Sequence, residues 1–158
     1  MSRDILDPVT RVNKKTTIPS TVAYRLGILG TIAANSFSAE IESLNLKPKQ
    51  VGLLVALDHD VAASQQELAA RLGVVPSLVV SLADQLEQRG AVRRERDPAD
   101  RRRQILTLTD RGRELLDQAA QAAEQVDRAL TARLTAAQLG ALHEALAVLA
   151  TDAGLPGA

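Results

Sequence analysis

Two short helical patterns, separated by a tight bend, constrain the fold of this chain more than any other feature. They are SQQELAARLG and PSLVVSLADQLEQRG. Ser64 and Glu67 have the spacing of a capping box at a helix start, and Gly73 is suited to the end of that helix. After the bend, Pro76 is suited to a first helical position, and Gly90 ends the second pattern. Two short helices joined in this way predict a helix-turn-helix.

A β-hairpin is predicted directly after the second helix. AVRRER and RQILTLT are strand-like runs, and DPADR between them has the composition of a hairpin loop. The range from Arg89 to Arg103 holds seven arginines against three acidic residues, although the whole chain has 19 basic and 19 acidic residues and no formal net charge. A localised basic patch of this kind is what a polyanionic partner recognises.

The rest of the chain is predicted to be helical. Apolar residues recur every three or four positions from Thr21 to about Ser43, and Pro48 begins a short helix with the sequence KQVGLLVALD. A long Ala- and Glu-rich helix follows Thr109 and runs to about Leu134. Thr135 begins a last helix with a second capping box. Tyr24 and Phe37 are the only aromatic residues, so Leu, Val, Ile and Ala must build the core.

The order of these elements predicts a mainly α fold with a small β-hairpin wing, that is, a winged helix-turn-helix with N- and C-terminal dimerisation helices. Residues 1–47 would form a polar arm and the first helix, residues 48–109 the winged lobe, and residues 110–158 the C-terminal helices, all within one structural domain. The leucine stripe of the last helix could be monomer core. Because little single-domain core is left for the terminal helices to cover, burial across a two-fold axis is favoured.

ELAARLGV, followed by LADQLEQRGAVRRERDPADRRRQILTLTDRGRELL, resembles the MarR (multiple antibiotic resistance regulator) family of transcription factors. The resemblance covers about Val51 to Leu116 and is most specific at the wing, in Asp100, Arg102, Leu108, Thr109 and Gly112. It implies a homodimer that places two recognition helices in successive major grooves and its wings in the flanking minor grooves of a pseudo-palindromic DNA site. Many family members are repressors released by small acidic or phenolic ligands. The expected partners are therefore double-stranded DNA and a small-molecule effector, with no cofactor.

The wing arginines suit DNA because a guanidinium is planar, permanently charged and able to enter a narrow minor groove. The resemblance places Arg102 in that groove, and Asp100 would hold an arginine by a charge-assisted hydrogen bond. Arg101 and Arg103 alternate across the strand and could meet phosphates. The alternative is a solvated hairpin whose arginines pair with the acids Glu95, Asp97 and Asp100.

The recognition helix lacks a positive charge at its start and middle, where family members often carry arginine or another polar residue. If Val79, Leu82 and Leu86 face the core, the exposed face carries Ser77, Leu78, Val80, Ser81 and Gln85. The two serines can bond phosphates or bases, Gln85 can pair with adenine, and Leu78 or Val80 could touch thymine methyl groups. Both apolar residues could equally belong to the core. The operator sequence is left open.

Other functions have little support in the sequence. His59 and His143 stand alone, without the clustering of a metal site, and no catalytic constellation indicates an enzyme. The absence of cysteine excludes thiol-based sensing and is compatible with a reducing cytoplasm. The N-terminus lacks the apolar run of a signal peptide, and VGLLVAL is far shorter than the roughly 20 residues that span a bilayer. A cytoplasmic protein without a membrane partner is expected.

The effector pocket cannot be assigned from the sequence. Tyr24, Arg25 and Phe37 lie near the junction of the first helix with the lobe and could line one, although packing explains the two aromatic residues equally well. Two rival functions remain. A winged-helix module that binds proteins instead of DNA would explain the uncharged recognition helix. A helical enzyme has no group of residues in its favour.

Overall fold

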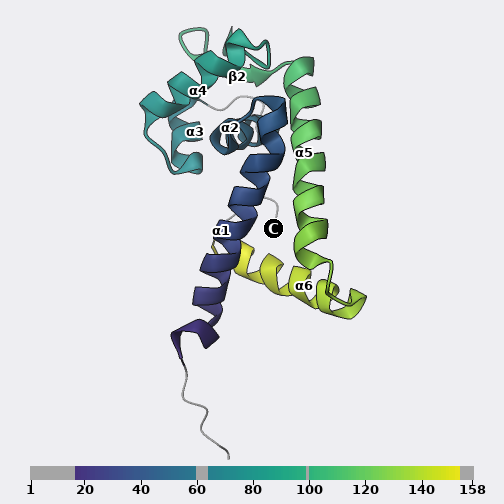
Figure 1. The fold of residues 1–158 in the computed structure, drawn as a ribbon. Helices are drawn as coiled ribbons and strands as arrows, with labels where there is room; N and C mark the ends of the chain where they lie inside the picture. Colours follow the sequence, from purple (N-terminus) through teal and green to yellow (C-terminus); the bar gives the residue numbers. More distant parts are fainter. Residues whose placement is uncertain (1–16, 60–63, 99, 154–158) are drawn as a thin grey trace, which may run out of the picture. The chain divides into compact units, whose positions relative to one another are not determined.

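The computed structural model describes residues 17–59, 64–98 and 100–153 (Figure 1). The chain divides into two compact units, residues 1–32 and 33–158. The first unit contains a short 3-10 helix, η1 (Ile18–Ser20), and the beginning of α1 (Val22–Glu40). Most of the predicted N-terminal arm, residues 1–16, lies outside the described residues. The predicted partition into residues 1–47, 48–109 and 110–158 stays a prediction.

The predicted first helix is confirmed, and its last turn tightens into a second 3-10 helix, η2 (Ile41–Leu44). Asn45 ends this helix with a left-handed backbone (φ 53°), and its N–H bonds to the carbonyl oxygen of Glu42. No residue of α1 is buried, and the helix exposes several large apolar side chains: Val22, Tyr24, Leu26, Ile28, Leu29 and Ile32. Large exposed apolar surface is costly in water, so these side chains make α1 a candidate interface.

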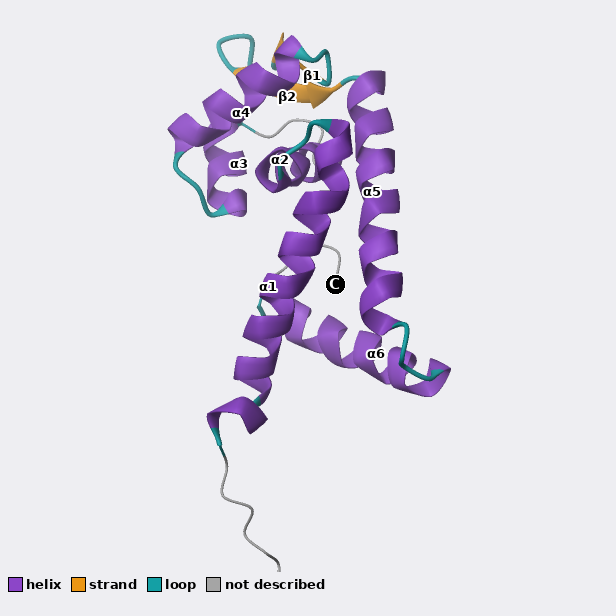
Figure 2. Cartoon of the chain, viewed as in Figure 1, coloured by secondary structure: helices purple, strands orange, loops and turns teal. Residues whose placement is uncertain are grey.

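Three helices and a hairpin form the lobe: α2 (Pro48–His59), α3 (Gln65–Leu72), α4 (Pro76–Gln88), β1 (Val92–Arg96) and β2 (Gln104–Leu108) (Figure 2). The capping box of α3 is present, and Gly73 ends this helix with a left-handed backbone (φ 60°). The strands are antiparallel, with Val92 opposite Leu108 and Arg96 opposite Gln104. The predicted winged helix-turn-helix is confirmed.

The core of the second unit is aliphatic, as the composition predicts. Val79, Leu82 and Leu86 of α4 are all buried, which confirms the face predicted for this helix. They join residues of α2, α3, the sheet and α5, among them Leu53, Leu54, Leu68, Leu106 and Leu115. The opposite face of α4 is therefore directed to solvent.

Two helices follow the wing, α5 (Asp110–Thr131) and α6 (Ala136–Asp152). Thr109 caps α5 by accepting the N–H of Gly112, and Thr135 caps α6 by accepting the N–H of Gln138. Helix α5 packs against α2 and buries Leu115, whereas α6 buries no residue. None of the described helices is by itself long and apolar enough to cross a membrane; α3 and α4 meet the same criteria only as a pair bent by 106°.

Candidate nucleic-acid interface

The exposed face of α4 presents most of the side chains that the sequence predicts. Ser77, Val80, Ser81 and Gln85 are exposed, and Val80 retains 38% of its surface. Leu78 is half-buried and packs against the core, as the packing interpretation of this residue expects. The contact of all five residues with DNA stays a prediction.

Val75, which the sequence analysis did not single out, adds to this face. It precedes Pro76 with an extended backbone (φ −72°, ψ 145°) and is 63% exposed. Its position before a proline was the available signal, because such a residue is driven out of the helical region. The start of α4 therefore presents an apolar side chain next to the hydroxyl group of Ser77.

The acidic residues of α4, Asp84 and Glu87, both pair with Arg94 of β1. The hydrogen bond from Arg94 to Asp84, reinforced by the charge of Glu87, raises the pKa of the guanidinium above its usual value. Since α4 itself carries no basic residue, Arg94 supplies the counter-charge for the two carboxylates. This arginine joins the hairpin to α4.

A buried glutamine of α2 bonds to the exposed face of α4. Gln50 is only 5% exposed. Its side-chain Nε2 donates to Oε1 of Gln85 at 2.9 Å. Gln85 Nε2 donates in turn to the Ser81 hydroxyl at 3.3 Å. Sequence reasoning missed Gln50, because it stands between Lys49 and an apolar run and its partner lies 35 positions further along the chain.

The loop of the wing, between Arg96 and Gln104, is closed by backbone bonds. The N–H of Asp97 donates to the carbonyl oxygen of Arg103 at 3.0 Å, and the N–H of Arg103 donates to that of Asp100 at 2.9 Å. The Asp100 carboxylate accepts the backbone N–H of Arg102 at 3.0 Å. This is a charge-assisted hydrogen bond to an arginine, as expected, and it is made to the main chain of Arg102; among the described residues Asp100 forms no ion pair with an arginine side chain. A short side chain two residues earlier reaches this N–H most easily.

Several arginines of the basic segment have structural partners. Arg89 donates to the carbonyl oxygens of Leu44 and Asn45, at 2.8 and 2.7 Å, and so holds the end of η2. Arg93 pairs with Glu95 at 2.7 Å, as the alternative of a salt-bridged hairpin expects for this residue. Arg96 donates to the carbonyl oxygen of Arg101 at 3.2 Å. These contacts stabilise the hairpin and its junction with the lobe.

The three consecutive arginines of the wing differ in their surroundings. Arg103 pairs with Glu67 of α3 at 3.6 Å. Arg101 and Arg102 are exposed, and no carboxylate within the described ranges lies in ion-pairing distance of either side chain. Unpaired guanidinium groups at a loop tip are available to an external anion. Arg101 and Arg102 therefore present unpaired positive charge in the loop of the wing.

Glu67 connects the start of α3 to the wing. Its carboxylate accepts the backbone N–H of Ser64 at 2.6 Å, and Ser64 Oγ accepts the N–H of Glu67 at 3.3 Å. Hydrogen bonding to the Ser64 side chain and backbone, with a smaller contribution from the charges of Arg103 and Arg71, lowers the pKa of Glu67. The carboxylate is thus ionised while it caps the helix.

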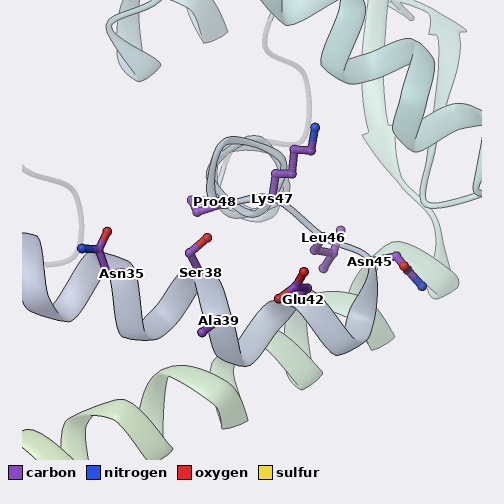
Figure 3. Close-up of a pocket in the computed structure, with 8 residues that line it drawn as sticks. All are labelled: Asn35, Ser38, Ala39, Glu42, Asn45, Leu46, Lys47 and Pro48. Atoms are coloured by element: carbon purple, nitrogen blue, oxygen red, sulfur yellow. The ribbon is translucent and has the colours of Figure 1, made fainter.

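A cavity of about 720 Å³ lies between the last turns of α1, η2 and the start of α2 (Figure 3). Its walls are Asn35, Ser38, Ala39, Glu42, Asn45, Leu46, Lys47 and Pro48. Tyr24, Arg25 and Phe37 are not among them, and Phe37 packs against the core.

His59 and His143 are exposed, and no group of three or more metal-ligand side chains gathers among the described residues.

Comparison with known proteins adds a family context to this geometry. A family model described as the MarR family matches residues 46–103, which span α2, the helix-turn-helix and most of the wing. The chain is 34% identical over 115 residues to a putative transcriptional regulatory protein for the hcr operon of Thauera aromatica. That alignment covers 72% of this chain and 69% of the relative.

Solved structures share the same fold. The transcriptional repressor CouR bound to a 23-mer DNA duplex matches with a TM-score of 0.71 and 33% identity, over 84% of this chain and 94% of that chain. CouR from Rhodococcus jostii RHA1 bound to p-coumaroyl-CoA matches with a TM-score of 0.70 and 24% identity, over 85% and 95% of the two chains. The similarity therefore extends beyond the lobe to the flanking helices.

Proposed function

Because the chain belongs to the MarR family of transcriptional regulators, as its sequence motifs predicted, we propose that it is a cytoplasmic homodimeric repressor. It binds a pseudo-palindromic site on double-stranded DNA and leaves this site when a small molecule binds. The observation that carries the proposal is the pair of unpaired arginines, Arg101 and Arg102, at the tip of the wing beside a helix-turn-helix. A wing beside a helix-turn-helix suits a protein that contacts duplex DNA in two grooves.

In this proposal the wing supplies the electrostatic attraction. Arg102 enters the minor groove, where the negative potential is strong, and Arg101 contacts a phosphate. Arg103 gives up its long, exposed ion pair with Glu67 and contacts a phosphate instead. Asp100 stabilises the loop by accepting the backbone N–H of Arg102. An exposed ion pair stabilises little, so the exchange costs little.

The exposed face of α4 supplies sequence selectivity in the major groove. Ser77 and Ser81 bond bases or phosphates, Gln85 bonds a base edge, and Val80 touches a thymine methyl group. Leu78 contributes the part of its side chain that the core leaves exposed. Because α4 has no basic residue, the proposal assigns the main attraction to the phosphates to the wing.

Dimerisation is supported by the apolar faces of the terminal helices. Helix α1 exposes Ile28, Leu29 and Ile32, and α6 exposes Leu142, Leu146 and Leu149. Neither helix has a buried residue. Burying these side chains against a second copy removes them from water and creates the two-fold symmetry that a pseudo-palindromic site requires.

The cavity beside η2 suits the effector of the proposed repressor. Lys47 and Glu42 provide one charge of each sign, and Asn35, Ser38 and Asn45 provide hydrogen-bonding groups. An effector lowers DNA affinity only if it binds the DNA-free conformation more tightly than the DNA-bound one. Because CouR binds p-coumaroyl-CoA, this thioester is the first probe, and a dissociation constant for DNA that rises with its concentration supports release.

The test of DNA binding uses duplexes from the region flanking the gene of this protein, at two salt concentrations. Arg102→Ala is expected to weaken binding by about 1–3 kcal/mol, the usual effect of losing an arginine that reads a groove. Arg128→Ala removes the same charge from an exposed pair with Glu124 on α5 and should leave affinity unchanged. Equal affinities of Arg102→Ala and the unaltered protein would remove Arg102 from the interface.

The winged-helix module that binds proteins remains the second candidate. The exposed apolar residues Val75 and Val80, on a helix without a basic residue, favour it. Such a module would show no sequence-selective DNA binding at low salt. A selective complex at low salt that weakens as salt is added would exclude it, because release of counterions from DNA makes binding salt-dependent.

A further inference from the structure

We propose that Gln50, a buried residue of α2, sets the direction in which Gln85 presents its amide to DNA, and so determines part of the base preference of α4. Gln50 is in this sense a positioning residue for recognition. The inference rests on the proposed function, since it takes α4 as the helix that reads the DNA. Helices α2 and α4 are in contact in the lobe (Figure 1).

The orientation of the Gln50 amide is determined by the backbone of Lys47. The N–H of Lys47 lies 2.9 Å from Gln50 Oε1, and a backbone N–H can only donate. The oxygen of the Gln50 amide must therefore face Lys47. This bond also caps the start of α2, since Gln50 is the third residue of that helix, where a glutamine commonly reaches back to the residue before the helix.

The direction of the Gln85 amide follows from that of Gln50. With its oxygen at Lys47, Gln50 directs its NH₂ group to Gln85 and meets Oε1 of Gln85 at 2.9 Å. The Gln85 NH₂ group is then directed to Ser81, whose hydroxyl accepts it at 3.3 Å. A serine hydroxyl can donate or accept, so Ser81 does not select the direction. The selection comes from Lys47 and reaches Gln85 through Gln50.

This fixed order matters because a glutamine distinguishes bases by the order of its acceptor and donor. Pairing with adenine requires the oxygen to accept from N6 and the nitrogen to donate to N7. A free amide can turn by 180° and satisfy either order. In this protein a turned Gln85 would place two NH₂ groups against each other and leave a buried donor of Gln50 without an acceptor. The bias against the turned amide is about 5- to 150-fold.

The test uses Gln50→Glu, Gln85→Ala and the double variant, each selected against a randomised duplex library at pH 8. The ionised carboxylate that Gln50→Glu introduces can accept from Lys47 but has no donor for Gln85, so the Gln85 amide must turn. We expect Gln50→Glu to change the preference for one base pair in each half-site by about fivefold or more. Gln85→Ala should lose that preference, and the double variant should match Gln85→Ala.

A purely structural role of Gln50 would lower the affinity for all sequences and the unfolding temperature, but would not change base preference. If Gln50→Glu does not fold, Gln50→Met, which removes donor and acceptor, should bind with the preference at that base pair lost. An unchanged preference in both Gln50 variants, or in Gln85→Ala, would overturn the inference and leave the proposed function standing. If the unaltered protein enriches no sequence, the proposed function itself fails.

Discussion

The close approach between α5 and the segment that follows α4 allows a quantitative test of the lobe. Gly112 lies in the first turn of α5, and a methyl group on it would be 2.1 Å from the carbonyl oxygen of Ala91 and 2.9 Å from Cδ2 of Leu108. The Ala91 oxygen is held in place because it accepts the N–H of Thr109 at 3.1 Å. Gly112→Ala therefore meets backbone that cannot move alone.

The size of the effect follows from two opposing contributions. A carbon and a carbonyl oxygen normally approach no closer than about 3.3 Å, so the added methyl group overlaps Ala91 by about 1.2 Å. Overpacking of a core costs about 1–3 kcal/mol, and a clash with backbone belongs at the upper end of that range. Replacing glycine by alanine in a helix returns about 1 kcal/mol. We expect Gly112→Ala to lower the free energy of unfolding by about 2 kcal/mol.

Scanning calorimetry at equal protein concentrations measures this difference, since the melting temperature of a dimer depends on concentration. For a chain of this length, 2 kcal/mol corresponds to a fall of about 4–8 °C. Gly52→Ala in α2 is the matched control, because its methyl group would meet only Leu72 Cδ2, at 3.4 Å; its melting temperature should stay the same or rise. If Gly112→Ala melts at or above the temperature of the unaltered protein, α5 does not pack against Ala91 and the hairpin as closely as described.

Four further predictions concern charged residues. The pKa of Glu67 is lowered in the folded state, so its ionised form stabilises the protein above the unfolded pKa of about 4.3, and this contribution is lost as pH falls through the folded value. Glu67→Gln keeps the cap but not the charge, and the difference between its melting temperature and that of the unaltered protein should shrink between about pH 6 and pH 3. Arg101→Ala should reduce the slope of log K against log[salt] by about 1. Arg103→Ala should reduce it less, because Arg103 already pairs with Glu67. Arg89→Ala should lower the free energy of unfolding, measured with urea, by about 1–3 kcal/mol, since it leaves two carbonyl oxygens without their donor. It should not change the slope of log K against log[salt].

The order of helices and strands could be predicted because its signals are local. Ser64 and Glu67 form their capping box within four residues, Gly73 adopts the left-handed backbone that ends α3, and Thr109 caps α5. Each depends on hydrogen bonds or dihedral angles within one turn of chain. The buried face of α4 could also be predicted, because helical periodicity alone determines which side chains share a face.

Contacts between distant segments could not be predicted in this way. Arg89 bonds to carbonyl oxygens 44 and 45 positions away, and Gln50 bonds to Gln85 across two helices. The sequence shows neither distance. It also could not distinguish the arginines of the hairpin from one another, because their partners depend on strand register and on the approach of α3 and α4. For Asp100 the sequence predicted a hydrogen bond to an arginine but not the atom that donates it, which is the backbone N–H of Arg102.

The pairing of the arginines is compatible with the proposed contact between DNA and α4, a helix without a basic residue. Helix α4 carries Asp84 and Glu87, and two carboxylates on an isolated recognition helix would repel phosphates. Arg94 projects from β1 and pairs with both, so the hairpin offsets one of the two negative charges of α4 before any DNA is bound. At the other end of the same hairpin, Arg101 and Arg102 lie beyond the reach of the described carboxylates. The dense run of arginines therefore suits two purposes in the proposed function: close to α4 it offsets negative charge within the lobe, and at the tip of the hairpin it leaves positive charge for the proposed contact with DNA.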